Sequence, residues 1–395
     1  MLRTHYLEQM KSTISLPLIK VLIGLRRIGK TTLLQQIQQE FKRKNPLMIN
    51  FELLEFERLL EYHRLNDFLE EEIKGWVDAI FLDEIQRIPS WELVINSLQT
   101  KHPKVQIFIT GSNSSILSNE LSTYLRGRYV EYYIAPFTYL EFCEYHRQTP
   151  GFKSFQEFLK IGWFPLLYQF QGWERESQFH LMLDTIFMRD IIERYQIRDA
   201  QLLRDLLFFL FQNAGNLTNA TKLAELLEQQ NIITNPNTVD QYLGYLEEVM
   251  LITPVQLYDI QWKKLFERIK KYYPVDHSCI NFTRSGFDIW LGKQLETYIY
   301  TSAKTYGWSA YVGRIRDQEV DFILEKGKKK LFVQATYLLD KEDVIQREYQ
   351  SLLDIPENWK KVVVSLDPYQ HEVREGIEHI QAWKWEEMLR KVEQG

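Results

Sequence analysis

The chain has 395 residues, of which 45% are hydrophobic and 26% charged, and its formal net charge is −5. This composition is typical of a globular protein of about two to four domains and excludes a disordered or fibrous one. The negative balance also excludes nucleic-acid binding by the whole surface, so any such contact needs a local basic patch.

Cysteine use and hydropathy indicate the compartment. Cys143 and Cys279 lie far apart and in no CxxC pair, which argues against a disulfide framework or structural zinc and fits a reducing environment. The first ten residues lack the apolar core of a signal peptide. The most apolar stretch, 202–211, includes Arg204 and Asp205 and is too short to span a bilayer. We therefore expect a cytoplasmic protein without a membrane partner.

Short apolar runs alternate with helical patterns over residues 19–137. The runs are almost continuously apolar, as strands buried on both faces are, and they occupy 19–24, 47–52, 79–84, 105–112 and 129–136. The helical segments between them predict right-handed crossovers and therefore an α/β domain with a parallel sheet.

A glycine turn follows the first run. Residues 24–31, Gly-Leu-Arg-Arg-Ile-Gly-Lys-Thr, match the phosphate-binding pattern G-x-x-x-x-G-K-[ST] without a mismatch. Backbone N–H groups of such a turn close around phosphate oxygens, and the following helix adds its positive end. Lys30 is expected at the β and γ phosphates of ATP, and Thr31 at Mg²⁺. The residues predicted to bind ATP or ADP are Gly24, Arg26, Arg27, Ile28, Gly29, Lys30, Thr31 and Thr32.

An acidic pair ends the run at 79–84. Asp83 is expected to hold Mg²⁺ through water, and Glu84 to orient and deprotonate the attacking water. A glutamate at this position indicates a hydrolysing ATPase rather than a kinase. The pair also predicts that the strand at 105–112 lies between the strand of the glycine turn and the strand of the acidic pair.

Further polar residues follow the later strands. Thr110, Ser112 and Asn113 end the run at 105–112, at the edge where ligands bind in open α/β sheets. Asn113 is expected to sense the γ-phosphate or position water. Arg126 and Arg128 flank a glycine before the last strand, and Arg128 is expected to stabilise transition-state charge on its own or a neighbouring nucleotide. A turn cap at Asn113 and a surface ion pair at Arg128 are the structural alternatives.

Several segments together resemble the bacterial and archaeal AAA+-type ATPases whose C-terminal half is a domain of unknown function. They read GLRRIGKTTLL, FLDEIQRIPSWE, TGSNSSILS and LRGRYVEYYIAPFTYLEF, with FMRDIIERYQIRD and EVDFIL further on. The resemblance covers most of the chain. It implies an ATP-binding core, a winged helix and a terminal domain like a degenerate PD-(D/E)XK nuclease, with switch-like or DNA-associated tasks.

The expected architecture therefore has four parts. An ATPase core over 1–140 is followed by a helical lid or connector over 141–200. Three helices closed by a strand-like segment, typical of a winged helix, occupy 201–285. Helices and strands over 286–395 form a restriction-endonuclease-like α/β domain.

The terminal part carries acidic residues in the order of the nuclease core. That core holds Mg²⁺ between acidic side chains beside a lysine, and here Glu296, Asp321 and the segment 334–336 follow in that order. The third segment, however, reads Gln-Ala-Thr, and Lys330 is too near the predicted hairpin to replace the missing lysine. We expect a relic of the fold, and an ion pair of Asp321 with Arg316 or a hairpin lysine is the simpler structural role.

Two basic segments are candidate binding sites for a partner. WKKLFERIKKYY at 262–273 and EKGKKK at 325–330 are candidates for contacts with DNA phosphates. The helix predicted at 237–250, in contrast, offers no basic residue to a major groove. Solvated basic faces are the alternative interpretation of both segments.

The sequence thus favours a Mg²⁺-dependent AAA+-type ATPase that acts as a nucleotide-controlled switch. The alternatives are a DNA-processing protein with an active nuclease tail, and a nucleotide-binding module with little turnover that docks a protein effector. The oligomeric state stays open, as does the choice between Arg128 acting in cis and in trans.

Overall fold

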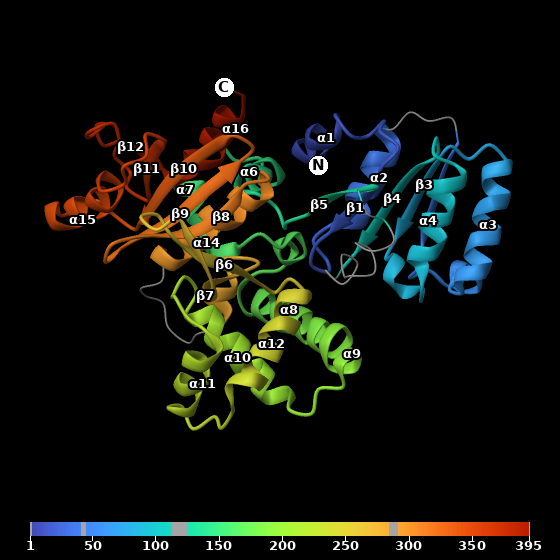
Figure 1. The fold of residues 1–395 in the computed structure, drawn as a ribbon, viewed down its shortest axis with the longest axis horizontal. Coiled ribbons are helices and arrows are strands. Elements are labelled where there is room, and N and C mark those ends of the chain that lie inside the picture. The colour runs from blue at the N-terminus through green and yellow to red at the C-terminus, as the bar shows by residue number, and fades with distance from the viewer. Residues whose placement is uncertain (1, 41–44, 113–124, 126, 284–290, 395) are drawn as a thin grey trace. The chain divides into compact units, whose positions relative to one another are not determined.

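The computed structural model describes residues 2–40, 45–112, 125, 127–283 and 291–394. The chain divides into two compact units, Met1–Ile134 and Ala135–Gly395 (Figure 1). The division lies close to the boundary predicted after residue 140. The three segments predicted beyond that boundary belong to a single unit.

The first unit is built on a five-stranded sheet. All its strands are parallel and their order is β2-β3-β4-β1-β5. The sheet therefore confirms the predicted α/β fold and places β4 between β1 and β3, as expected. The strands are β1 (Ile19–Ile23), β2 (Pro46–Asn50), β3 (Ala79–Asp83), β4 (Gln106–Gly111) and β5 (Tyr129–Tyr133), and the helices are α1 (Thr4–Met10), α2 (Lys30–Glu40), η1 (Leu54–Leu59), α3 (Tyr62–Lys74), η2 (Ile85–Arg87) and α4 (Trp91–Lys101).

The burial of the strands explains the apolar runs in the sequence of the first unit. Every residue of β1, β3 and β4 is buried, whereas the edge strands β2 and β5 are mostly half-buried. Inner parallel strands are covered on both faces, so they need apolar side chains at successive positions. Phe81 and Phe108 on the neighbouring strands β3 and β4 stack with ring centroids 4.7 Å apart.

The second unit begins with helices and ends with a mixed helix and strand region. The helical part contains α6 (Tyr139–His146), α7 (Phe152–Ile161), η4 (Pro165–Gln169), α8 (Gly172–Thr185), the π-helical turn η5 (Ile186–Ile192), α9 (Glu193–Tyr195), α10 (Ala200–Gln212), α11 (Ala220–Glu228) and α12 (Pro236–Glu248). The remainder contains β6 (Ile252–Asp259), β7 (Lys264–Pro274), α13 (Cys279–Phe282), α14 (Leu291–Thr305), β8 (Ser309–Ile315), β9 (Gln318–Lys326), β10 (Lys329–Thr336), α15 (Glu342–Leu353), β11 (Lys360–Ser365), β12 (Glu378–Gln381), η6 (Ala382–Lys384) and α16 (Trp385–Gln394).

Side-chain caps fix the starts of the three helices α10, α11 and α12. Asp199 accepts a hydrogen bond from Leu202 N at 2.9 Å, and Asn219 accepts one from Lys222 N at 2.8 Å. Asn235 accepts a hydrogen bond from Thr238 N at 3.0 Å. Each cap satisfies a backbone donor of the first helical turn that has no partner inside the helix.

One seven-stranded sheet unites the strands of the second unit. Its order is β12-β11-β10-β9-β8-β6-β7, and β6 runs parallel to β8. The β6–β7 hairpin, which the sequence analysis placed in the winged helix over 201–285, therefore forms one edge of the sheet made by the C-terminal strands. The four-residue strand β12 at the other edge was not predicted.

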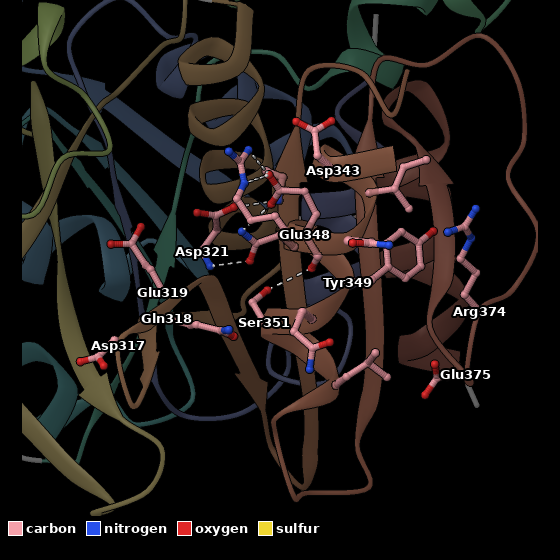
Figure 2. A pocket seen from close by; sticks show the side chains of 17 residues that line it. Asp317, Gln318, Glu319, Asp321, Asp343, Glu348, Tyr349, Ser351, Arg374 and Glu375 are labelled. Carbon is pink, nitrogen blue, oxygen red and sulfur yellow. Dashed lines mark hydrogen bonds and ion pairs between the residues drawn. The ribbon is translucent and has the colours of Figure 1, made fainter. Parts of the chain in front are cut away.

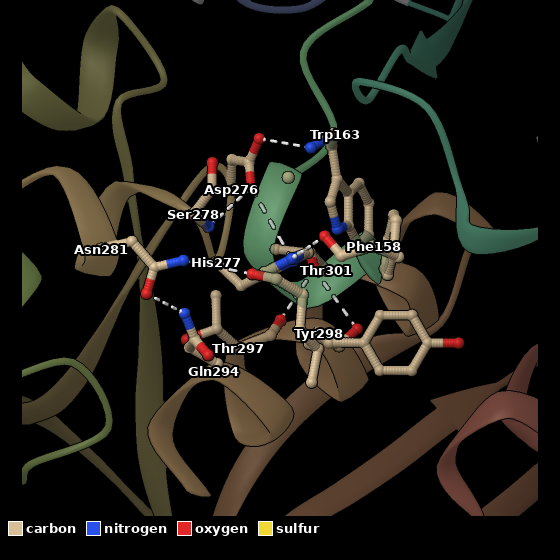
Figure 3. A network of polar contacts seen from close by, with 12 residues as sticks. Phe158, Trp163, Asp276, His277, Ser278, Asn281, Gln294, Thr297, Tyr298 and Thr301 are labelled. Atoms are coloured by element: carbon tan, nitrogen blue, oxygen red, sulfur yellow. Dashed lines mark hydrogen bonds and ion pairs between the residues drawn. The ribbon is translucent and has the colours of Figure 1, made fainter. Parts of the chain in front are cut away.

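A buried turn after β7 is bonded to the end of α7 (Figure 3). Asp276 accepts hydrogen bonds from Trp163 N at 2.7 Å and from Ser278 N at 2.8 Å. The ring nitrogen Nε2 of His277 donates to Phe158 O at 3.1 Å. The bond from Trp163 to Asp276 joins residues 113 apart in the chain, and the bond from His277 to Phe158 joins residues 119 apart. Gly162 enters this junction with φ +86°, so its backbone is in the left-handed region.

A buried carboxyl links α16 to the start of α6. Tyr139 N donates to Glu386 Oε1 at 2.8 Å, and Leu140 N donates to Oε2 at 3.2 Å. The hydroxyl of Tyr306 also donates to Oε2, at 3.3 Å. Glu386 is fully buried, and burial raises its pKa from 4.5 to about 7.

This carboxyl makes the stability of the second unit depend on pH. Between about pH 4.5 and pH 7 the folded chain binds a proton at Glu386 that the unfolded chain has lost, so stability falls as the pH rises. We expect urea unfolding to show a loss of roughly 3 kcal/mol across this window. Glu386→Gln removes that part of the slope, whereas Glu387→Gln, at the exposed neighbouring position, leaves it in place. Identical slopes in the parent and Glu386→Gln would refute the assignment.

Candidate nucleotide site

The glycine turn lies between β1 and α2 and closes tightly. A Cβ at position 24 would lie 2.2 Å from Ile134 O and 2.5 Å from Ile28 Cδ1, so only glycine fits there. Arg27 has φ +67° and Gly29 has φ +90°, both in the left-handed region. This backbone path turns the chain sharply from the carboxyl end of β1 into the first turn of α2.

Lys30 is the first residue of α2 and is only 4% exposed. Its ammonium donates to Gly24 O and Leu25 O, each at 3.0 Å, and lies 3.7 Å from Glu84 Oε1. The positive charge is therefore held inside the turn, beside the backbone that is expected to surround the phosphates.

The predicted pair of metal ligands is brought together. Thr31 Oγ1 donates to Asp83 Oδ2 at 2.7 Å, and Thr110 Oγ1 donates to Asp83 Oδ1 at 2.5 Å. Asp83 is fully buried, and burial raises its pKa, although the bonds from Thr110 and Thr31 act in the opposite direction. A hydroxyl and a carboxylate oxygen in contact are the oxygen donors that Mg²⁺ prefers, so these residues fit that ion.

Glu84 is held in place by neighbours from two elements. It has φ +57°, and its backbone N–H donates to Thr110 Oγ1 at 3.0 Å. Ser112 Oγ donates to Glu84 Oε2 at 3.1 Å, and Gln86 Nε2 donates to both the Glu84 carboxylate and Ser112 Oγ. The sequence analysis did not identify Gln86 as a residue that positions Glu84. The signal was its place two residues after Glu84 in the segment DEIQ.

The side chains of the other residues predicted to bind the nucleotide differ in their exposure to solvent. Arg27 and Thr32 are exposed, and Arg26 is half-buried, with its guanidinium 3.4 Å from Glu52 Oε1. The side chain of Ile28 is fully buried, so only its backbone belongs to the turn surface.

The structure does not bring Arg128 to its own turn. Arg128 precedes β5, and its carbonyl accepts a hydrogen bond from Ile19 N at 2.9 Å, at the amino end of the sheet. Its guanidinium donates to Asn96 and Thr100 on α4, each at 3.2 Å. The glycine turn, in contrast, follows the carboxyl end of β1, so the cis role is not supported. Asn113 and Arg126 lie outside the described residues.

In the second unit, Glu296 and Asp321 do meet, but around Lys271, a lysine of the basic segment 262–273 that was a candidate for contact with DNA. Lys271 Nζ lies 2.8 Å from Glu296 Oε1 and 3.6 Å from Asp321 Oδ1. The expected ion pair of Asp321 with Arg316 or a lysine of the β9–β10 hairpin was therefore wrong. Lys330 instead lies 3.1 Å from Glu325 and 3.3 Å from Glu357.

The two basic segments are only partly exposed. In 325–330, Lys326 donates to Tyr306 O and Lys329 donates to Val392 O, both at 2.6 Å. In 262–273, Lys270 lies 3.7 Å from Glu247. The exposed part of the second segment is the turn of the β6–β7 hairpin and the start of β7, with Trp262, Lys263, Lys264 and Arg268.

Fold and site together define an AAA-type P-loop ATPase domain. Residues 17–143 match the family model described as an AAA domain, and residues 152–287 match a domain of unknown function, DUF8612. An uncharacterised protein of Haemophilus influenzae is 30% identical over 396 residues, which cover 97% of this chain and 98% of the relative. An uncharacterised protein of Methanocaldococcus jannaschii is 30% identical over 407 residues, covering 93% and 88%. The chain belongs to the family of these relatives.

Solved structures show more distant similarity. Replication initiator DnaA bound to AMPPCP and single-stranded DNA aligns with a TM-score of 0.33 at 16% identity, covering 62% of this chain and 88% of that one. Cdc6p from Pyrobaculum aerophilum aligns with a TM-score of 0.29 at 12% identity, covering 68% and 88%. Similarity of this degree carries no conclusion about function. In the described part of the chain, none of the helices has the length and apolarity needed to cross a membrane.

Proposed function

We propose that the first unit binds ATP with Mg²⁺ and hydrolyses it, and that the chain acts as a nucleotide-controlled switch. The observation that carries the proposal is the group of contacts among Lys30, Thr31, Asp83 and Glu84 at the carboxyl ends of β1 and β3. Ligands bind at this edge in open α/β sheets.

Each residue has a defined task in this proposal. The N–H groups of the turn and the first turn of α2 bind phosphate oxygens, and Lys30 neutralises charge on the β and γ phosphates. Thr31 and Asp83 hold Mg²⁺, which when bound neutralises charge on the phosphate oxygens. Glu84 accepts a proton from the attacking water, while Ser112 and Gln86 fix its carboxylate. Arg128 has a place here only at the nucleotide of a neighbouring copy.

The second unit is proposed to carry the output of the switch. In this proposal, α10, α11 and α12 with the β6–β7 hairpin act as a winged helix, and the later elements form a degenerate PD-(D/E)XK fold. The order of the elements along the chain supports both assignments. The exposed Trp262 lies beside Lys263 and Lys264 at the hairpin turn. A stacking ring with neighbouring cations favours DNA as the partner over a protein effector.

The test is phosphate release from ATP by the purified full chain with Mg²⁺, with and without double-stranded DNA. Lys30→Ala is expected to weaken nucleotide binding at least about tenfold, because it removes a charged hydrogen bond to phosphate. Lys101→Ala, which removes an exposed ammonium of α4, is the matched control and leaves binding unchanged. Turnover that rises with DNA supports the DNA-coupled switch, and turnover indifferent to DNA favours a protein effector. A parent chain that neither binds nor cleaves ATP would refute the proposal.

A further inference from the structure

A buried ammonium lies among three carboxylates in the second unit. Lys271, on β7, is 2% exposed, and its Nζ lies 2.6 Å from Glu319 Oε1 and 2.8 Å from Glu296 Oε1. Asp321 Oδ1 lies 3.6 Å away. Because Glu296 is on α14 and the other two acids are on β9, this single side chain joins three elements.

Lys271 and the preceding Lys270 point to opposite faces of β7. Successive side chains of a strand point to opposite faces. Lys271 and Tyr273 both bind Glu296, whose Oε1 accepts a hydrogen bond from the tyrosine hydroxyl at 2.6 Å. Lys270 points the other way and lies 3.7 Å from Glu247, with its side chain 26% exposed.

Asp321 and Gln334 have further partners in the cluster. Asp321 Oδ2 accepts a hydrogen bond from Ala335 N at 2.8 Å. Gln334 Oε1 accepts one from Asp321 N at 3.3 Å, and its Nε2 donates to Glu348 Oε2 at 2.8 Å. Asp321, Glu319 and Glu348 line one part of an open pocket of about 950 Å³ (Figure 2). The amide oxygen of Gln334, the only atom of that side chain able to bind a metal, is therefore used by the main chain.

These contacts do not fit the divalent cation that the nuclease resemblance implies. Such a cation would lie about 2 Å from a carboxylate oxygen and would need roughly six oxygen ligands. A cation on Glu296 Oε1 would therefore stand within about 5 Å of the Lys271 ammonium, which is 2.8 Å from the same oxygen. The lysine of the nuclease core acts on the attacking water beside its cation. The Lys271 ammonium, in contrast, is itself in contact with the carboxylate oxygens that would have to bind the cation. Burial alone would lower the pKa of Lys271, but Glu296, Asp321 and Glu319 raise it overall and keep the ammonium charged.

We propose that Lys271 takes the place of the divalent cation in this cluster. The three carboxylates and Lys271 then form a metal-free clasp that fixes the edge hairpin β6–β7 to α14 and β9. The second unit accordingly does not cleave phosphodiester bonds by a metal-dependent reaction.

Thermal unfolding with and without Mn²⁺ alone tests the clasp, using the nucleotide-free full chain. All variants carry Asp83→Asn, which removes the carboxylate ligand of the first unit from the comparison. We expect Mn²⁺ to leave the Tm of this parent unchanged within about 1 °C. Lys271→Met is expected to lower the Tm by at least about 5 °C and to speed hydrogen exchange in β7, because it leaves buried carboxylates without their cation. Lys270→Met, the matched control on the opposite face, is expected to shift the Tm by less than about 1 °C.

Three results would overturn the proposal. They are a rise in the parent's Tm with Mn²⁺, an unchanged Tm in Lys271→Met, and Mn²⁺-dependent nicking of supercoiled plasmid that disappears in Asp321→Asn. The Mn²⁺ and plasmid measurements on the parent decide the matter even if Lys271→Met fails to fold. In that case Glu319→Gln, at the most exposed carboxylate of the cluster, replaces it and is expected to lower the Tm without Mn²⁺ raising it again.

Discussion

Glu84→Gln is expected to bind ATP like the parent chain and to hydrolyse it at least about 100-fold more slowly. General-base catalysis contributes about 10²- to 10⁴-fold, and glutamine has the same shape but cannot accept the proton from water. The structure favours retained binding, because Ser112 and Gln86 are able to hydrogen-bond the amide oxygen in place of the carboxylate. Single-turnover ATP cleavage together with nucleotide titration separates the two effects.

Glu70→Gln is the matched control for this variant. Glu70 is also a partly buried carboxylate of the first unit, but it bonds to Lys101 and His102, each at 2.9 Å. Its substitution is expected to leave turnover unchanged. Normal turnover in Glu84→Gln would remove Glu84 as the base and leave the glycine turn as a site that binds nucleotide with catalysis from elsewhere.

Gly162→Ala is expected to destabilise the second unit by roughly 3 kcal/mol or more. A Cβ at this position would lie 2.1 Å from Ser278 Oγ and 2.4 Å from Ser278 Cβ, and Ser278 is fully buried. The backbone also has φ +86°, which costs a residue with a side chain about 1–2 kcal/mol by itself. To relieve this overlap, the turn at 276–278 has to move, although a hydrogen bond between Asp276 and Trp163 N holds it in place. Overpacking of this kind costs about 1–3 kcal/mol more.

Urea unfolding followed by tryptophan fluorescence measures this loss. Gly151→Ala is the control, because a Cβ at position 151 would meet no described atom within 4 Å and the backbone there is extended. Adding Ser278→Gly to Gly162→Ala removes the overlapping atoms and is expected to recover part of the stability, leaving the cost of the backbone conformation. Gly162→Ala as stable as the parent would contradict the close packing at this junction.

The first unit could be predicted closely from the sequence, for a physical reason. Its inner strands are buried on both faces, so burial shows directly as runs of apolar residues. The glycine turn needs a particular local backbone geometry. Gly24 and Gly29, at their fixed spacing, make that geometry recognisable in the sequence. The contacts among Lys30, Thr31, Asp83 and Glu84 follow from parallel strands that end at the same edge of the sheet.

The second unit was harder to predict because its main features depend on pairing between distant segments. No local pattern shows that β6 bonds to β8, since β7, α13 and α14 lie between them in the chain. Lys271 belongs to the basic segment 262–273, which in sequence is equally compatible with contact to DNA and with a solvated basic face. The side chains of Lys270 and Lys271 point to opposite faces of β7, and only this difference leaves Lys270 partly exposed and Lys271 buried.

The seven-stranded sheet also limits where the chain can be cut. A truncation near residue 285 would separate β6 and β7 from β8, and so expose the hydrogen-bonding edge of β6 that β8 now covers. An unpaired edge of this kind pairs readily with other strands and promotes aggregation. A fragment carrying only the helices and the β6–β7 hairpin is therefore a poor choice for binding studies, whereas the division between Ile134 and Ala135 leaves both sheets whole.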